Sequence, residues 1–342
     1  MLSNDVHQHL WTEPLIAALA ARRSAPRVRR EERGWQLELV GEPLSLVPAE
    51  TPSARAATVR ADGIDRALIA LSSALGVELL APEEAAPLLA AHAGLATDRA
   101  LVRAGRPVGA DAGAASADAE AESADDRPGS AARPEPARLG IWAATSLADP
   151  AEAARELPAA LTHAAGLCLP AGPLATPAGV ERVAPLLAAL EAADRPLFVH
   201  PGPAAAPDGA PAWWPALADY VAQLQAAWLA FAVAGRPAHP SLRVVFAALA
   251  GLAPLHAERI AARGGPGGAA ADPLVFYDSS SYGPAAFDAM AARVGLAQLV
   301  HGTDRPVVRP ARSPVAGAAW SAIATFNPAR LLAPDDPDKE SR

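Results

Sequence analysis

Two histidines stand one residue apart near the start of the chain, in the stretch DVHQHL at residues 5–10. Because successive side chains of a β-strand point to opposite faces, His7 and His9 would share one face of a strand. Two imidazoles held in this way suit a zinc-type ion, which takes nitrogen and oxygen ligands at about 2 Å. A pair of histidines is a weak signal alone, so the metal hypothesis depends on partners elsewhere in the chain.

Two further polar residues close apolar runs later in the sequence. His200 ends LFVH and is followed by Pro-Gly, and Asp304 ends the last apolar run in HGTD. A lone carboxylate in an apolar setting is costly unless it is paired or bound to a metal. Together with His7 and His9, these residues predict a site for one divalent metal ion with a position open for water. Asp304 would also accept a proton from that water.

Eight apolar, β-rich runs could position these side chains, and Ala- and Leu-rich stretches with helical spacing separate them. Near-continuous apolar strands alternating with helices indicate a parallel sheet covered on both faces. Eight such units predict an α/β fold, a (β/α)8 TIM barrel with its catalytic groups at the carboxyl ends of the strands. A doubly wound open sheet is the alternative, but its glycine-rich turn is missing after the first strand. The runs are 6–11, 66–73, 139–144, 166–170, 196–201, 243–251, 274–280 and 298–304.

Two segments interrupt the repeating pattern. Residues 12–60 follow strand 1 and would form an insertion at the catalytic mouth, where WQLELV and LSLV around Gly41-Glu42-Pro43 predict a hairpin. Residues 104–137 are rich in Gly, Ala, Ser, Pro and acidic residues and contain no aromatic residue, so we expect a disordered insert before strand 3. We therefore predict a single domain over 1–333, followed by a tail at 334–342.

Several other residues are weaker candidates for contacts with a substrate. Asp278 and Ser280 end the seventh strand, although capping of the next helix explains the serine equally well. Trp213 and Trp214 follow the fifth strand and could wall a pocket, or pack in the core or a subunit interface. Three arginines of RVRREERG could bind an anionic substrate, although a solvated charge run is the simpler interpretation. They are Arg27, Arg29 and Arg30.

Composition excludes some classes of partner. The 342 residues carry a net charge of −8, which argues against nucleic-acid binding because that needs a basic face. No uncharged apolar run reaches membrane-spanning length, so we expect a cytoplasmic protein with a small-molecule substrate and no membrane partner. The single cysteine, Cys168, defines no cysteine-based metal site.

Several motifs together resemble the amidohydrolase superfamily, and within it the branch of aminocarboxymuconate-semialdehyde decarboxylase. They are DVHQHLW, FVHPGP, VVFAALAGLAPLHAERI, FYDSSSYG, LVHGTDRPV and NPARLL, spread from residue 5 to about 332 outside the 104–137 insert. The resemblance implies a metal-dependent TIM barrel with His7, His9, His200 and Asp304 as ligands. Zinc is the favoured ion and manganese the alternative. A homodimer is also implied. A lysine-bridged pair of metals is excluded, because the only lysine is Lys339.

One departure from the family concerns the end of the sixth strand, where members usually carry a histidine and this chain has Ala248. Proton transfer by such a residue is typically worth about 10²–10⁴-fold in rate. His256 is a candidate substitute, although an exposed helix histidine is the simpler interpretation. We therefore expect a metal-dependent hydrolase or carboxy-lyase acting on a small carboxylated, lactone or amide substrate. The alternatives are a catalytically impaired metal-binding barrel with a binding role, and a metal-free barrel.

Overall fold

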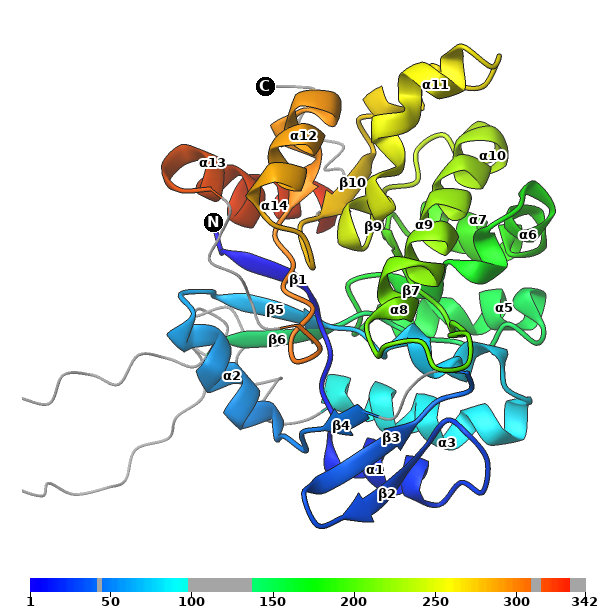
Figure 1. The fold of residues 1–342 in the computed structure, drawn as a ribbon, viewed down its shortest axis with the longest axis vertical. Coiled ribbons are helices and arrows are strands. Elements are labelled where there is room, and N and C mark those ends of the chain that lie inside the picture. Colours follow the sequence, from blue (N-terminus) through cyan, green and yellow to red (C-terminus); the bar gives the residue numbers. More distant parts are fainter. Residues whose placement is uncertain (42–44, 98–136, 309–314, 333–342) are drawn as a thin grey trace, which may run out of the picture.

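The computed structural model describes residues 1–41, 45–97, 137–308 and 315–332. Each of the eight apolar runs overlaps a parallel strand, which confirms the α/β class (Figure 1). The strands form two parallel sheets, ordered β1-β5-β6 and β11-β10-β9-β8-β7. Their bounds are β1 Asn4–Gln8, β5 Arg66–Ile69, β6 Arg138–Ile141, β7 Leu167–Pro170, β8 Leu197–His200, β9 Val244–Phe246, β10 Val275–Asp278 and β11 Leu299–Val300.

Single parallel β-bridges connect the two sheets. Ala143, just after β6, pairs with Leu167 at the start of β7, and Gln8 at the end of β1 pairs with Arg305 beyond β11. Strands that follow one another in the sequence therefore also lie next to one another in space.

The strands are apolar on both faces because each face packs against a different part of the core. On β8, Phe198 belongs to a cluster that receives a residue from each parallel strand or its first following position. Leu197 and Val199, on the opposite face, pack in the larger cluster that also contains helix residues. This two-sided burial explains the near-continuous apolar runs of the sequence.

Helices follow most of the strands and surround them in Figure 1. Several begin at a side-chain cap that accepts backbone N–H groups, such as Asp149 before α5 and Thr12 before α1. Their bounds are α1 Glu13–Ala20, α2 Pro52–Ala61, α3 Pro82–Ala93, α5 Pro150–Leu161, α6 Pro177–Arg182, α7 Ala184–Ala192, α8 Trp214–Leu217, α9 Asp219–Ala230, α10 Arg236–Ala238, α11 Ala257–Ala261, α12 Pro284–Val294, α13 Gly317–Ser321 and α14 Asn327–Leu332.

One helical run, Trp214–Ala238, is long and apolar enough by length and composition to cross a membrane. This is weak evidence, because a core helix of a soluble protein passes the same test. In the structure Leu224, Trp228 and Phe231 of this run pack into the large apolar cluster.

The insertion after β1 contains a small antiparallel sheet of β2 (Arg27–Glu31), β3 (Gly34–Glu38) and β4 (Ser45–Val47). Trp35 pairs with Val47 across β3 and β4, which agrees with the expected hairpin. The charged run RVRREERG is part of the sheet as well, because β2 pairs with β3. The 104–137 insert, apart from Ala137, and the 334–342 tail lie outside the described residues.

The sixth strand is shorter than the run 243–251 predicts. β9 ends at Phe246, and Ala248 to Leu252 form five consecutive residues with φ between 46° and 65°. Only Gly251 among them lacks a Cβ atom, and a left-handed conformation costs other residues roughly 1–2 kcal/mol each. The chain therefore turns away from the sheet immediately after β9, at a strained position.

Candidate metal centre

Four side chains converge where β1, β8 and the segment after β11 meet. His7 lies on β1, His9 directly follows it, His200 ends β8, and Asp304 follows β11. The Nε2 atom of His9 lies 3.2 Å from Nε2 of His7, 3.2 Å from Nε2 of His200 and 3.2 Å from Oδ1 of Asp304. One ligand atom from each of the four lies within 4.8 Å of the other three. We call these four residues the His–Asp cluster.

The second nitrogen of each imidazole is bound to an acceptor outside the cluster. Nδ1 of His7 donates to Oδ2 of Asp278 at 2.7 Å. Nδ1 of His9 donates to the carbonyl of Ala70 at 2.9 Å, and Nδ1 of His200 donates to the carbonyl of Pro201 at 2.8 Å. A neutral imidazole that donates through Nδ1 presents a lone pair at Nε2. All three rings are therefore oriented with their ligand atoms inward, as metal-binding histidines usually are.

Further contacts fix the backbone that carries the cluster. Asp5 accepts the backbone N–H of His7 and of Thr303, both at 3.1 Å, and the Thr303 hydroxyl at 2.6 Å. The backbone N–H of Asp304 donates to the carbonyl of His7 at 2.8 Å. Asp5 therefore joins β1 to the segment that carries Asp304.

Gly302 and Arg55 also help to hold the cluster in place. A Cβ atom at Gly302 would lie 2.7 Å from Oδ1 of Asp278, so the approach of Asp278 to His7 requires glycine at this position. The buried Arg55 of α2 donates to the carbonyl of His9 at 2.7 Å and pairs with Glu50 at 2.6 Å.

Charge within the cluster suits a cation. Burial acts to lower the pKa of His7, but the carboxylates of Asp278 and Asp304 outweigh it and raise the pKa to about 9. Burial, with the charges of His9 and His7, holds the pKa of His200 well below its ordinary value. Burial acts to raise the pKa of Asp304, but His7 and His9 outweigh it and lower the pKa. His200 therefore stays neutral and Asp304 ionised, as metal binding requires, whereas His7 would have to lose its proton when an ion binds.

The cluster lies in a cavity of about 510 Å³. His7, His9, His200 and Asp304 all contribute to its wall, and Asp304 is the most exposed of them at 14%. Ala248 and Ser280 also line this cavity. Leu37, Leu39 and residues 45–48 line it as well, so the insertion after β1 contributes to its wall.

The other candidate residues are distributed differently from the sequence-based expectation. Asp278 is fully buried and bound to His7, which is an orienting contact. Trp213 lines the cavity, whereas Trp214 is half-exposed beside it on α8 and is not part of the wall. His256 is exposed just before α11 and lines none of the cavity, so it does not occupy the place left by Ala248.

The three arginines of β2 do not line this cavity either. Arg27 forms a bidentate pair with Glu38 across the small sheet, at 2.7 and 2.8 Å, and Arg29 lies 3.7 Å from the same carboxylate. Arg30 stacks on the ring of Trp35 and lines a separate cavity. The pairing of β2 with β3 places Arg27 and Arg29 beside Glu38, and Arg30 beside Trp35. The sequence did not indicate this strand pairing for the charged run.

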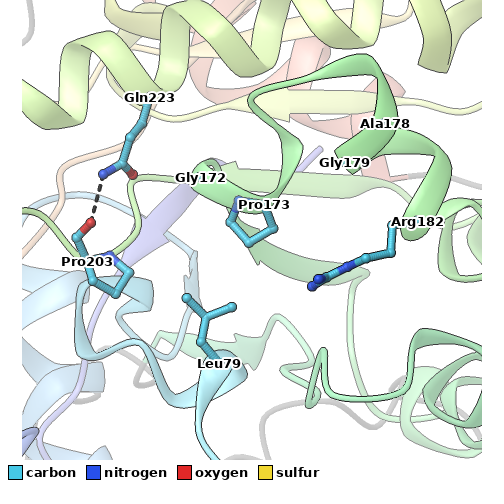
Figure 2. Close-up of a pocket in the computed structure, with 8 residues that line it drawn as sticks. All are labelled: Leu79, Gly172, Pro173, Ala178, Gly179, Arg182, Pro203 and Gln223. Carbon is cyan, nitrogen blue, oxygen red and sulfur yellow. Dashed lines mark hydrogen bonds between the residues drawn. The ribbon is translucent and has the colours of Figure 1, made fainter.

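A second concave region lies apart from the His–Asp cluster. This cavity has a volume of about 550 Å³. Figure 2 shows its lining residues, with Arg182 on one side and Gln223 on the other. The amide of Gln223 is engaged, because it accepts from the N–H of Gly202 and donates to the carbonyl of Pro203, both at 2.8 Å. Its wall contains no histidine and no carboxylate. This second cavity therefore offers no candidate metal ligand.

No protein-family model and no curated protein matches this sequence. Solved structures do match it along nearly the whole chain. The IDCase of Metarhizium anisopliae, solved in apo form, is 17% identical with a TM-score of 0.67, over 98% of each chain. The 5-carboxyvanillate decarboxylase of Sphingomonas paucimobilis is 17% identical with a TM-score of 0.66, over 97% of this chain and 98% of its own.

A third structure contains a metal ion. It is the 5-carboxyvanillate decarboxylase of Novosphingobium aromaticivorans, complexed with manganese and 4-hydroxy-3-methoxy-5-nitrobenzoic acid. It is 15% identical to this chain with a TM-score of 0.65, over 97% of this chain and 96% of its own. These matches confirm, at the level of the fold, the resemblance that the sequence motifs indicate: the chain has the fold of the amidohydrolase-type decarboxylases.

Proposed function

We propose that this chain is a metal-dependent carboxy-lyase with one divalent ion held by His7, His9, His200 and Asp304. The observation that carries the proposal is the orientation of the three imidazoles. Each directs Nδ1 to an acceptor outside the cluster, so three Nε2 atoms and one carboxylate converge at the wall of a cavity. Such a donor set, all nitrogen and oxygen, fits a first-row divalent ion.

The chain's own residues have separable roles in this proposal. A divalent ion would act as a Lewis acid on a substrate carboxylate. Asp278 and the carbonyls of Ala70 and Pro201 orient the imidazoles. Asp304, the most exposed ligand, would take up a proton from solvent and pass it to the substrate carbon. In the reaction the bond between carbon and the carboxylate breaks, carbon dioxide leaves, and the electron pair left on carbon takes up a proton.

The proposal includes a closed (β/α)8 barrel formed by a single domain over 1–333. Its support is the pair of bridges that connect β6 to β7 and β1 to the segment after β11. An apolar cluster that receives a residue from each parallel strand, or from the position directly after it, also supports it. In such a barrel catalytic groups lie at the carboxyl ends of the strands, where His200 and Asp304 stand.

For the ion we propose manganese rather than zinc. The sequence-based preference for zinc rests on imidazole ligands, which manganese also accepts. Manganese is the ion bound in the Novosphingobium decarboxylase.

A test of this function compares metal-stripped protein with protein reloaded with one equivalent of manganese or zinc. We expect carbon dioxide release from members of a panel of aromatic and aliphatic carboxylates only after reloading, and faster with manganese. Asp304→Asn should lose this activity, whereas His256→Ala should keep it. Activity that survives removal of the metal would contradict the proposal.

Ala248 favours a second candidate function, a metal-binding barrel with a binding role and little turnover. Ala248 lines the cavity beside the His–Asp cluster and supplies no proton-transfer group there. Its φ of 46° is one that histidine tolerates better than most residues, so Ala248→His is compatible with the backbone. A rise in turnover toward the typical contribution of about 10²–10⁴-fold would favour the enzyme. If wild type and variant were both inactive but still bound a carboxylate, the result would favour the binding role.

A further inference from the structure

We propose that the substrate carries a single carboxylate on an otherwise apolar body, long enough to reach from the His–Asp cluster to the mouth of the cavity. This inference rests on the proposed function, because it assigns the carboxylate to the metal. It concerns the part of the substrate other than the carboxylate, which the fold alone does not define.

The wall of the cavity above the cluster is mostly apolar. Segments distant in the sequence contribute to it: β3 and β4, the turn after β5, the helices α8 and α9, and residues 306–308 after β11. The polar side chains besides the cluster are hydroxyl groups of serine and tyrosine. The apolar wall residues include Leu37, Leu39, Val47, Leu75, Val221 and Leu224.

Charge is nearly absent from this wall. Among the described residues that line the cavity, Asp304 is the only charged side chain other than the histidines, and no arginine or lysine is present. Arg27 and Arg30 of β2 are engaged by Glu38 and Trp35 respectively. A second carboxylate on the substrate would be buried without a partner, which is strongly unfavourable. The wall therefore selects for one negative charge, located at the cluster.

The mouth of the cavity carries large apolar side chains that are unusually exposed. Leu46 of β4 is 54% exposed, Trp213 before α8 is 57%, Val307 after β11 is 62% and Leu217 of α8 is 64%. All four line the same cavity although they come from three separate segments. Exposed apolar side chains gathered around a groove mark a ligand site. They would cover the far end of a long apolar substrate.

The test uses manganese-loaded protein and calorimetric titration with butanoate, hexanoate, octanoate and octanedioate. Each methylene that is buried should tighten binding by about fourfold, so affinity should rise along the three monocarboxylates. Octanedioate should bind at least about tenfold more weakly than octanoate, because its second charge is left unpaired. Equal or tighter binding of octanedioate would overturn the inference, as would affinity independent of chain length.

A matched pair of variants locates the effect at the mouth. Leu217→Glu places a charge where the far end of octanoate should lie, and we expect it to weaken octanoate by about fivefold or more while leaving butanoate unchanged. Leu229→Glu, at an exposed position of α9 that does not line the cavity, should change neither. Equal weakening of both acids by Leu217→Glu would contradict the inference.

Metal-stripped protein separates this inference from the proposed function. Loss of binding without metal, combined with no dependence on chain length, would overturn the apolar body and leave the metal-dependent function standing. Unchanged binding without metal, combined with a clear dependence on chain length, would overturn the metal-dependent function and leave the apolar substrate body standing.

Discussion

Two groups of buried polar side chains lie among the strands, and they differ in their charges and in their hydrogen-bond partners. The first is the His–Asp cluster. The second, which we call the Glu78 cluster, consists of Ser73, Glu78 and Cys168, all fully buried. Ser73 donates to Oε1 of Glu78 at 2.8 Å and lies 3.8 Å from Sγ of Cys168.

The Glu78 cluster lacks the features that make the His–Asp cluster a candidate site. Oε2 of Glu78 is buried and has no hydrogen-bond partner in the part of the chain that the structure describes. Burial raises the pKa of Glu78 to about 7 and also raises the pKa of Cys168. None of the three residues lines the cavity of the His–Asp cluster.

The comparison shows that burial of polar groups does not by itself indicate a site. In the His–Asp cluster the carboxylate stays ionised because histidines face it, and each imidazole has an outer partner. In the Glu78 cluster burial acts without an opposite charge and favours the neutral acid. The His–Asp cluster is arranged to bind a cation, whereas the Glu78 cluster lowers the free energy of unfolding at high pH.

The largest expected effect is loss of the metal in His9→Ala, because His9 stands 3.2 Å from three other ligand atoms. We expect manganese affinity to fall by more than the roughly 10–100-fold that is typical for loss of an outer partner. Elemental analysis after dialysis against manganese measures this, with His256→Ala as the control. Equal metal content in the two variants would mean that the His–Asp cluster does not hold the metal.

The next largest effect concerns Glu78→Gln. The pKa of Glu78 is raised in the folded protein, so its contribution to stability is intact below the unfolded value near 4.5 and is lost as the pH rises through about 7. Removing the charge should therefore increase the free energy of unfolding at pH 8 by about 3 kcal/mol. The gain should shrink toward zero as the pH falls to 4.5. Urea unfolding of both proteins across this range measures it, and a gain independent of pH would refute the assignment.

Asp278→Asn tests the outer partner of His7. The variant keeps an acceptor for Nδ1 but removes the charge, so we expect manganese affinity to fall by about 10–100-fold, measured by competition with a chelator. Ser280, whose hydroxyl lies 3.2 Å from the same Nδ1, is the control, and Ser280→Ala should have a smaller effect. If Asp278→Asn bound metal as tightly as wild type, the charge of the outer partner of His7 would not contribute to metal affinity.

Ser73→Ala should have the smallest effect. It removes the hydrogen bond to Oε1 of Glu78, which is worth about 1 kcal/mol, so the thermal midpoint should fall by only a few degrees. Metal affinity should not change, because the Glu78 cluster lies outside the cavity. A change in metal affinity would mean that the two clusters are coupled.

Much of the fold and of the cluster follows from local sequence patterns. Strand periodicity alone places His7 and His9 on one face, and the ends of apolar runs locate His200 and Asp304. These predictions rest on the two-residue period of a strand, which does not depend on the rest of the molecule. The eight strands were identifiable from their near-continuous apolar runs, although β5, β9 and β11 are much shorter than those runs.

The tertiary structure decided the surroundings of the cluster. The acceptors for His9 and His200 are backbone carbonyls, which have no sequence signature. Asp278 faces His7 rather than a substrate because Gly302 allows it to approach.

Contacts between distant segments decided the rest. Arg27 is engaged by Glu38 through a strand register that a charge run does not reveal, and Ala248 reaches the cavity through a left-handed turn. The apolar wall is assembled from segments more than 250 residues apart, from Leu37 to Val308. The sequence by itself therefore determined which side chains could hold a metal, and only the folded chain determined what surrounds it. Strand periodicity is a local property, whereas partners, charge pairing and cavity walls arise from contacts between distant segments.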